Sequence, residues 1–415
     1  MIVYEGKLKG KEYQYRRLDE AIRTGLFIRN ACLKYWEDGQ AKTRNDFSKY
    51  CTILGKSKEF PWAGKLNSQA RQAMSERAWA AISRFFDNCK NQIKGKKGYP
   101  KYKKNRPNHG SVEYKTSGWK LSENRDSITF TDGFKAGEFK LYGTRDLNYY
   151  QLTQIKRVRV VRRADGYYAQ FCIDHDRTED RTPTGHNVGL DVGLNHFYTD
   201  SDGQTVDNPR FLRKSDQALK RLQKRVSKKF KKGQPQSNNY KKAKQKLAKK
   251  HLKVSRQRKD FAVKTALCVV RSNDLVAYVD APAACRRLDL QVRNMVKNHH
   301  LAKSISDAAW SEFRRTLEYF GKVFGVATVA VKPHYTSQNC SNCGCVVKKT
   351  LSTRTHKCKC GFILDRDWNA AINILKEALR TLRAYRNIPG ILDKRFGTTR
   401  PMRVLMRINT RLVVG

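Results

Sequence analysis

Acidic residues are scarce in this chain of 415 residues, where 37 aspartates and glutamates stand against 86 lysines and arginines. The formal net charge of +49 and the pI near 10.1 lie far outside the range of ordinary globular proteins. Such an excess of positive charge predicts a large polyanionic partner, and nucleic acid fits this description best.

Long apolar runs are also missing. The chain has no stretch of about eighteen consecutive apolar residues, and no signal-peptide pattern opens it, so we expect neither a membrane span nor a membrane partner. Its eleven cysteines do not form the pattern of a disulfide framework, because four of them cluster and the others are scattered. This usage favours a reducing compartment, and we expect the cytoplasm. The length predicts at least two domains with buried cores.

Four of the cysteines form two close pairs, at Cys340, Cys343, Cys358 and Cys360. The first is a C-x-x-C pair, the second is a C-x-C pair, and fourteen residues separate them. Pairs at this separation can converge on one tetrahedral Zn²⁺ through four thiolates. Gly344 and Gly361 follow the pairs directly, where a metal knuckle needs a tight turn. Buried apolar cysteines are the alternative, but the spacing favours a zinc ribbon, with Cys345 as a spectator.

Acidic residues follow the second cysteine pair and interrupt an earlier strand. Asp365 and Asp367 stand at the start of an alanine-rich helical stretch, which suggests a catalytic metal site beside the zinc ribbon. Alternatively, both are ordinary carboxylates stabilised by the helix dipole. Asp191 lies within VGLDVGLNHF, where an acid in an apolar strand needs a partner, usually a metal. A hydrogen-bonded turn aspartate beside Gly193 is the alternative there.

The N-terminal half alternates between strand and helix patterns. Residues 2–9 read as a strand, and residues 17–36 and 68–93 carry apolar side chains at helical spacing. This order predicts a small helical domain inserted after the first strand. Residues 111–174 read as short strands separated by turns, and they predict a small β-barrel. Two further strands and one helical segment are expected at 275–279, 327–331 and 304–320.

Three basic segments are candidates for contact with nucleic acid. In the turn GKKGYPKYKK, lysines that can neutralise phosphates alternate with tyrosines that can stack on bases. The strand IKRVRVVRR places basic side chains on exposed positions. From Arg213 to Lys259 the chain has one aspartate among many cations and predicts two helices broken at 233–239. A solvated basic surface is the alternative for the turn and for the helices. The candidate residues are Lys97, Tyr99, Lys101, Tyr102, Lys103, Arg157, Arg159, Lys224, Arg225 and Lys228.

These segments together resemble the TnpB family of transposon-encoded RNA-guided nucleases, relatives of the type V CRISPR effectors. The resemblance covers about residues 15–376 and leaves the C-terminal tail outside it. The segments that carry it are RNACLKYW, SRFFDNCKNQIKGKKGYPKYKK, VGLDVGLNHF, DLQVRNMVKNHHLAKSISDAAW, YTSQNCSNCG and CKCGFILDRDWNAAINIL. The last two are highly specific in this order and at this separation.

The resemblance implies a multidomain architecture of α+β and α/β parts. It also implies two partners, a guide RNA and double-stranded DNA beside a short flanking motif, with base pairing rather than the protein reading the target sequence. The expected parts are a wedge-like β-barrel (1–10 and 95–182), an inserted helical recognition domain (11–94), a RuvC-like domain of RNase H type (183–333 and 362–380), an inserted zinc ribbon (334–361) and an unassigned basic tail (381–415).

Nucleases of this family cut with three acids that hold two Mg²⁺ ions. By resemblance, the first acid maps onto Asp191 and the third onto Asp367. The second is normally a glutamate that ends an apolar strand, and here the sequence departs from the pattern. Reading forward from LVAY places Val279 at this position, and reading backward from DLQVRNM places Leu288 there. Asp280 is the nearby carboxylate, but a shift of one residue turns a strand side chain to the opposite face.

We therefore expect RNA-guided targeting of double-stranded DNA by a TnpB-like protein whose cleavage is lost or weak. A two-metal centre that lacks one ligand loses much of its rate. The first alternative is an active endonuclease that uses Asp191, Asp280 and Asp367 with two Mg²⁺ ions. The second is a non-guided RNA-binding or architectural protein. The expected cofactors are Zn²⁺ at the four cysteines and Mg²⁺ at Asp191 and Asp367.

Overall fold

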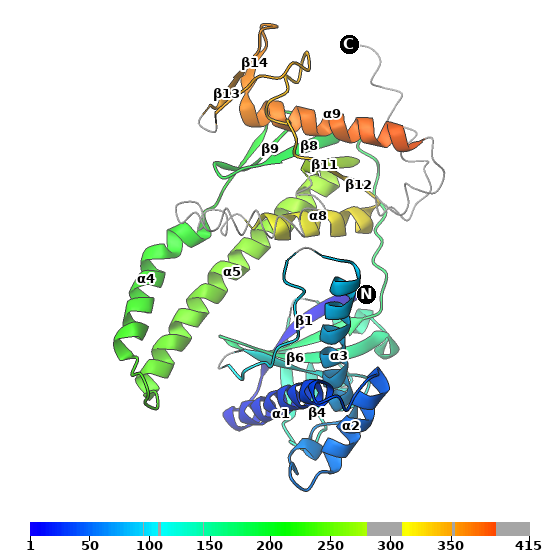
Figure 1. Cartoon of the computed structure of the whole chain (residues 1–415), viewed down its shortest axis with the longest axis vertical. Helices are drawn as coiled ribbons and strands as arrows, with labels where there is room; N and C mark the ends of the chain where they lie inside the picture. Colours follow the sequence, from blue (N-terminus) through cyan, green and yellow to red (C-terminus); the bar gives the residue numbers. More distant parts are fainter. Residues whose placement is uncertain (94, 107–108, 144, 280–308, 351–352, 387–415) are drawn as a thin grey trace. The chain divides into compact units, whose positions relative to one another are not determined.

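The computed structural model describes the chain except for residues 94, 107–108, 144, 280–308, 351–352 and 387–415. It divides into two compact units, Met1–Arg177 and Thr178–Gly415 (Figure 1). The first unit contains a seven-stranded sheet and a helical layer. The second contains a five-stranded sheet, a long helical hairpin and the paired cysteines. Across the described residues, no helix combines the length and apolar character needed to cross a membrane.

The sheet of the first unit is a curled half-barrel. Its strands are β1 (Ile2–Lys9), β2 (Gly110–Tyr114), β3 (Trp119–Leu121), β4 (Ser127–Phe130), β5 (Gly137–Tyr142), β6 (Ile155–Arg163) and β7 (Gly166–Ile173). They pair antiparallel in the order β2-β6-β7-β1-β5-β4-β3. Within the described residues the edge strands β2 and β3 do not pair with each other. The barrel predicted from the sequence is therefore open on one side.

The helical layer of the first unit consists of α1 (Glu12–Glu37), α2 (Arg44–Lys56) and α3 (Ser68–Lys90). The two helices predicted from apolar periodicity are confirmed as α1 and α3. Helix α2 is absent from the prediction, although its capping box is readable in the sequence: Thr43 Oγ1 accepts the Asp46 N–H, and Asp46 accepts the Thr43 N–H. The same packing brings the thiols of Cys32 and Cys51 within 3.6 Å of each other. Short 3-10 helices lie at Ala63–Lys65, Leu147–Tyr149 and Leu152–Gln154.

The sheet of the second unit is mixed. Its strands are β8 (Asn187–Val192), β9 (His196–Asp200), β10 (Thr205–Asp207), β11 (Leu275–Val279) and β12 (Ala327–Val331), in the order β10-β9-β8-β11-β12. Strands β8, β9 and β10 pair antiparallel, whereas β11 is parallel to both β8 and β12. The strands predicted at 275–279 and 327–331 are confirmed.

Helices cover both faces of this sheet. Helices α5 (Asn238–Ser272) and α8 (Trp310–Phe324) pack on one face, and α9 (Arg366–Arg386) packs on the other (Figure 1). Along β11, Val276 and Tyr278 join the core with α5 and α8, while Leu275 and Ala277 join the core with α9. Because both faces are covered, the segment LVAYV is apolar at every position.

A helical hairpin extends from the sheet of the second unit (Figure 1). It consists of α4 (Phe211–Lys229) and α5, held together by a small core of Leu219, Val226 and Leu247. The two predicted basic helices are confirmed, and the break between them falls where the glycine-proline segment predicted it. The C-terminus of α5 is followed by Asp274, which is buried. Its carboxylate accepts the backbone N–H groups of Thr184 and Gly185 at 3.0 and 2.7 Å.

Candidate functional site

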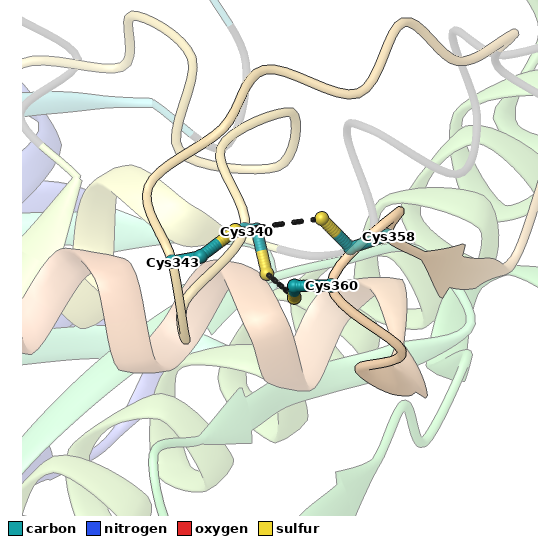
Figure 2. A group of neighbouring side chains, drawn as sticks. All are labelled: Cys340, Cys343, Cys358 and Cys360. Atoms are coloured by element: carbon teal, nitrogen blue, oxygen red, sulfur yellow. Dashed lines mark hydrogen bonds between the residues drawn. The ribbon is translucent and has the colours of Figure 1, made fainter.

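The four paired cysteines converge on one point, in a segment that also contains the short hairpin of β13 (Thr355–Lys357) and β14 (Ile363–Asp365). Figure 2 shows their side chains turned toward one another, and all four Sγ atoms lie within 4.8 Å of one another. The separation is 3.8 Å between Cys340 and Cys360 and 3.5 Å between Cys343 and Cys358. A tetrahedron with Zn–S bonds of ~2.3 Å has edges of about 3.8 Å. The cluster therefore has the dimensions of a Zn²⁺ site.

The loops that carry these sulfurs are shaped for a metal. Gly344 and Gly361 adopt positive φ angles of 79° and 85°, which a side chain would disfavour. The backbone N–H of Phe362 is the main cause that lowers the pKa of the Cys360 thiol to about 7. The pKa of Cys340 is also lowered, whereas the pKa values of Cys343 and Cys358 are raised. Zn²⁺ ligation requires all four as thiolates, so binding of the metal would release protons. Cys345 lies outside the four-sulfur cluster.

Asp191 and Asp367 come together at one end of the five-stranded sheet. Asp191 is the penultimate residue of β8, and Asp367 lies in the first turn of α9, which packs against β8. Burial first, and then the negative charge of Asp367, raise the pKa of Asp191 to about 7. A buried carboxylate whose pKa is raised in this way by a neighbouring acid is typical of a metal-binding or catalytic centre.

Gly189 allows helix α9 to approach β8 closely. A Cβ atom at this position would lie 2.3 Å from the carbonyl oxygen of Ala371, a distance that no side chain can adopt. The start of α9 is fixed as well, because Trp368 Nε1 donates to the Ser201 carbonyl at 3.0 Å. Close backbone contact two residues before Asp191 thus sets the position of the helix that carries the second acid.

Asp365 and Asp367 have different roles, although both stand at the helix start. Asp365 Oδ1 accepts the backbone N–H groups of Asp367 and Trp368 at 2.8 and 3.1 Å, which is the geometry of a helix N-cap. Asp367 accepts the Nε and Nη2 of Arg366 at 3.0 and 2.9 Å and lies 3.8 Å from Arg354. The helix-end interpretation therefore fits Asp365, whereas guanidinium groups hold Asp367 in place.

One face of α9 anchors the first cysteine loop. Asn369 is fully buried; its Oδ1 accepts the Ser341 N–H at 2.9 Å, and its Nδ2 donates to the Asn339 carbonyl at 2.8 Å. Asn373 donates to the same carbonyl, and Lys376 donates to the Ser341 carbonyl. The sequence analysis does not identify these three residues, although their spacing of four and three residues marks one helical face. The helix that carries Asp367 therefore also holds the cysteine loop.

The register of the sheet identifies the neighbour of Asp191 on β11. The parallel pairing runs from Leu275 opposite Asn187 to Tyr278 opposite Leu190, so Val279 is the next residue in line, beside Asp191. Val279 packs with the cluster that faces α9. The residue of β11 next to Asp191 is therefore apolar. Asp280 and Leu288 lie outside the described residues.

Asp191 and Asp367 are carboxylates of the kind that can hold Mg²⁺. Mg²⁺ is commonly held by one or two carboxylates with water completing its shell, and Asp191 and Asp367 supply that number. A two-metal centre needs a further bridging acid. In the part of the chain that the structure describes, no third acid forms a ligand group with this pair.

The predicted contact turn at 97–103 is anchored along α1. The backbone N–H of Lys103 donates to Asn30 Oδ1 at 3.1 Å, and its carbonyl accepts Asn30 Nδ2 at 2.9 Å. The hydroxyls of Tyr99 and Tyr102 donate to Glu37, while both rings remain half exposed. The ring of Tyr99 also packs against Phe85 of α3 and Trp36 of α1, with centroids 5.3 and 6.0 Å away. Of the two tyrosines, Tyr99 is therefore already partly engaged within the first unit.

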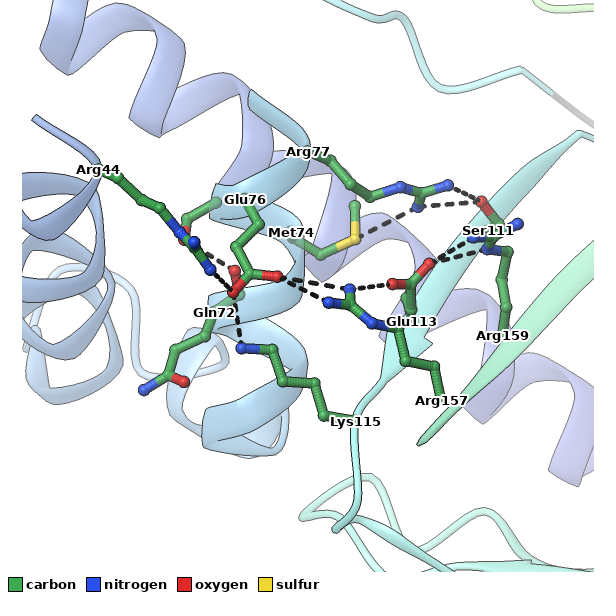
Figure 3. A network of polar contacts seen from close by, with 11 residues as sticks. Arg44, Gln72, Met74, Glu76, Arg77, Ser111, Glu113, Lys115, Arg157 and Arg159 are labelled. Atoms are coloured by element: carbon green, nitrogen blue, oxygen red, sulfur yellow. Dashed lines mark hydrogen bonds and ion pairs between the residues drawn. The ribbon is translucent and has the colours of Figure 1, made fainter. Parts of the chain in front are cut away.

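Arg157 and Arg159 are engaged within the half-barrel (Figure 3). Buried Glu113 on β2 accepts Arg157 Nη1 at 2.7 Å and Arg159 Nε and Nη2 at 2.9 and 2.7 Å. Neighbouring Glu76 pairs with Arg44 and lies 3.4 Å from Arg157. Burial opposes ionisation of Glu113, but the two arginines more than offset it, and its pKa is lowered. Both predicted nucleic-acid contacts therefore already have carboxylate partners.

The other predicted contacts divide into two groups. Lys97 Nζ donates to the Ile93 carbonyl, so it has an internal partner. The exposed residues are Lys101 in the contact turn and Lys224, Arg225 and Lys228 on α4. The hairpin cations thus remain accessible to a phosphate backbone.

Comparisons with known proteins agree with these features. The family model OrfB_IS605, described as "Probable transposase", matches residues 170–299, and the model "Cas12f1-like, TNB domain" matches residues 310–374. A protein of Streptomyces pristinaespiralis named "Putative RNA-guided DNA endonuclease" is 31% identical over 326 residues, which cover 78% of this chain and 75% of that protein. The Escherichia coli (strain K12) protein "Putative RNA-guided DNA endonuclease InsQ" is 30% identical over 295 residues, covering 69% and 70%.

Two solved structures share the fold. A Cas12f1–sgRNA–target DNA complex matches with a TM-score of 0.53 and 14% identity, covering 88% of this chain and 83% of that chain. The mini-RNA-guided endonuclease CRISPR-Cas_phi3 matches with a TM-score of 0.51 and 8% identity, covering 91% and 92%. At these identities the likeness concerns the fold alone.

Proposed function

The chain belongs to the TnpB family of transposon-associated RNA-guided nucleases, and on this premise we propose that it binds a guide RNA and targets double-stranded DNA beside a short flanking motif. We further propose that its nuclease centre is impaired and cuts weakly or not at all. The observation that carries this second part is the placement of Val279 beside Asp191, where a bridging carboxylate is needed. Such a protein occupies its target without efficient cleavage, in the cytoplasm.

Several features of the second unit support a RuvC-like domain of RNase H type. Three antiparallel strands are followed in the sheet by two parallel ones, and α9 brings Asp367 to Asp191 at the end of the central strand. We assign this domain to 183–333 and 362–380 and the zinc ribbon to 334–361. In the first unit we assign the wedge-like part to 1–10 and 95–182 and the recognition helices to 11–94.

The side chains around the centre have distinct tasks in this proposal. Asp191 and Asp367 would hold Mg²⁺, which when bound supplies a Lewis acid for phosphodiester hydrolysis. Arg366 orients Asp367 through two hydrogen bonds, and Asp365 caps the helix that carries it. Val279 offers no oxygen to a second ion. The cysteine cluster would hold Zn²⁺ and stabilise the loop that α9 anchors.

The proposal is tested with purified protein, the RNA that co-purifies with it, and a plasmid that carries a matching target. Sequencing of that RNA should reveal one defined species, and the complex should bind the target while leaving the plasmid intact in Mg²⁺. Efficient cleavage that disappears in Asp191→Ala would contradict the impaired centre. RNA of mixed sequence would contradict guided targeting and favour a non-guided RNA-binding protein.

An active endonuclease is the second candidate function. It is supported by the pairing of Asp191 with Asp367, which a centre without any role in binding metal does not require. This candidate needs a carboxylate from Asp280. Guide-dependent cleavage that is lost in Asp280→Ala and retained in Asp280→Glu would establish it, and cleavage unaffected by Asp280→Ala would exclude it.

A further inference from the structure

Two aromatic rings lie side by side at the tip of the hairpin formed by α4 and α5, which we define as residues 228–244. Phe230 directly follows the last residue of α4, and Tyr240 lies in the first turn of α5. Their ring centroids are 6.0 Å apart with an interplanar angle of 47°. The side chain of Phe230 is 55% exposed, so packing against the hairpin core does not account for it.

The loop between these rings is held in one conformation by its own side chains. Gln236 Oε1 accepts the Lys231 N–H at 3.3 Å, and Gln236 Nε2 donates to the carbonyls of Lys231 and Gln234. Ser237 Oγ accepts the Tyr240 N–H at 3.2 Å and caps α5. These hydrogen bonds restrain the loop, and restraint before binding reduces the conformational entropy lost when a ligand binds to the rings.

The charge around the rings has one sign. No acidic residue occurs between Asp216 and Asp260. Lys244 Nζ lies 5.9 Å from the centroid of the Tyr240 ring. The lysines of the tip are all exposed, and they are Lys228, Lys229, Lys231, Lys232, Lys241, Lys242 and Lys244.

We propose that the hairpin tip binds an unpaired nucleotide of a single-stranded nucleic acid, with its base stacked on Phe230 and its flanking phosphates paired with the neighbouring lysines. An exposed ring amid lysines is the combination that single-strand binding uses, since every base has a π-face and every linkage has a negative charge. In the interior of a duplex the faces of the bases are covered by their neighbours, so a base there cannot stack on the ring. This site deepens the proposed function. Binding of a single strand at the tip does not depend on guided targeting, but the identity of the strand that is bound in the cell rests on the proposed function.

The test uses the full-length protein, a labelled single-stranded oligonucleotide of about 16 nucleotides and arbitrary sequence, and the corresponding duplex. Phe230→Ala should weaken single-strand binding about five- to twentyfold and change duplex binding less than about twofold. Phe230→Trp should retain the affinity and show quenching of the added indole fluorescence when the single strand binds. Tyr319→Ala is the matched control, because this ring is 42% exposed on α8 outside the tip and should leave both affinities unchanged.

The stacking and charge contributions are separated by salt. The slope of log affinity against log salt should be unchanged in Phe230→Ala. The double variant Lys231→Gln with Lys232→Gln should reduce the slope by about 1.4, since two phosphate contacts to a single strand are lost. A reduced slope in Phe230→Ala together with an unchanged slope in the lysine double variant would show that the phosphates are bound elsewhere, and it would overturn the assignment.

Other results also overturn the proposal. Unchanged single-strand affinity in Phe230→Ala, or an equal loss with single strand and duplex, excludes base stacking. If Phe230→Ala loses binding to anionic lipid vesicles but keeps the oligonucleotide, the tip is a membrane-contact site instead. Failure of guided targeting is distinguishable, because the oligonucleotide has arbitrary sequence and its binding requires no guide.

Discussion

Gly189 of β8 and Ala371 of α9 touch through their backbones, since an added Cβ atom at Gly189 would lie 2.3 Å from the Ala371 carbonyl oxygen. Gly189→Ala must therefore push α9 away from the sheet. We expect a loss of about 1–3 kcal/mol in the free energy of unfolding, measured by urea denaturation. Gly6→Ala is the control, because there the nearest atom is the flexible end of Leu141, 3.3 Å away. Equal stability of the two variants would show that α9 does not rest on Gly189.

The nuclease centre can be repaired by a single substitution if Val279 occupies the place of the missing acid. Val279→Glu should raise guide-dependent cleavage at least ~10²-fold over the parent protein. The gain should disappear when Asp191→Ala is added. The gain in cleavage should be absent in Val279→Gln, because glutamine has nearly the same shape as glutamate but carries no charge. A plasmid cleavage time course in Mg²⁺ measures all four proteins, and a silent Val279→Glu variant would contradict the assignment of the position.

Asn369 links the cysteine loop to the helix of Asp367. Asn369→Ala leaves the buried Ser341 N–H without its 2.9 Å acceptor, which costs about 1–3 kcal/mol. We expect faster transfer of Zn²⁺ to a chelator, followed with a colorimetric metal indicator. Glu377→Ala on the same helix should not change this rate, because it removes only an exposed ion pair with Arg380. Equal rates of Zn²⁺ transfer in Asn369→Ala and Glu377→Ala would show that Asn369 does not stabilise the cysteine loop.

The metal content of the cysteine cluster is a direct prediction. The purified protein should contain one Zn²⁺ per chain by elemental analysis, and Cys343→Ser should lower this content and the thermal stability. Cys345→Ser should retain both, because this thiol lies outside the cluster although it is only two residues away. Loss of zinc in Cys345→Ser would show that Cys345 is one of the zinc ligands and would contradict the assignment of the four cysteines.

Glu113 predicts how acid destabilises the half-barrel. Its pKa is lowered in the folded state, so its pairing with Arg157 and Arg159 stabilises the fold above the unfolded pKa of about 4.3 and is lost as the pH falls through the folded value. Glu113→Gln should therefore cost on the order of 2–3 kcal/mol at pH 7, and the cost should shrink progressively as the pH is lowered below about 4, by urea denaturation. Glu12→Gln, in an exposed pair with Arg16, should cost little at either pH.

The sequence was sufficient wherever local spacing decides the structure. The spacing of the cysteine pairs predicted that their four sulfurs converge, and the segment LVAYV predicted a buried strand; both are found. Alternation along β6 indicates exposed arginines, and it cannot reveal that β2 places Glu113 opposite them. Closure of the half-barrel likewise depends on pairing between distant strands. The position of Val279 beside Asp191 follows only from the register between β11 and β8, which the sequence alone does not reveal.

The length of α5 has a mechanical consequence. Its 35 residues span about 52 Å, and it joins the hairpin tip to β11 without interruption. At the β11 end, the carboxylate of Asp274 fixes the chain through the backbone of Thr184 and Gly185. A force applied to the hairpin tip would therefore be transmitted along α5 to β11, the strand that ends at Val279. A ligand bound at the hairpin tip would exert such a force, which α5 transmits to the five-stranded sheet.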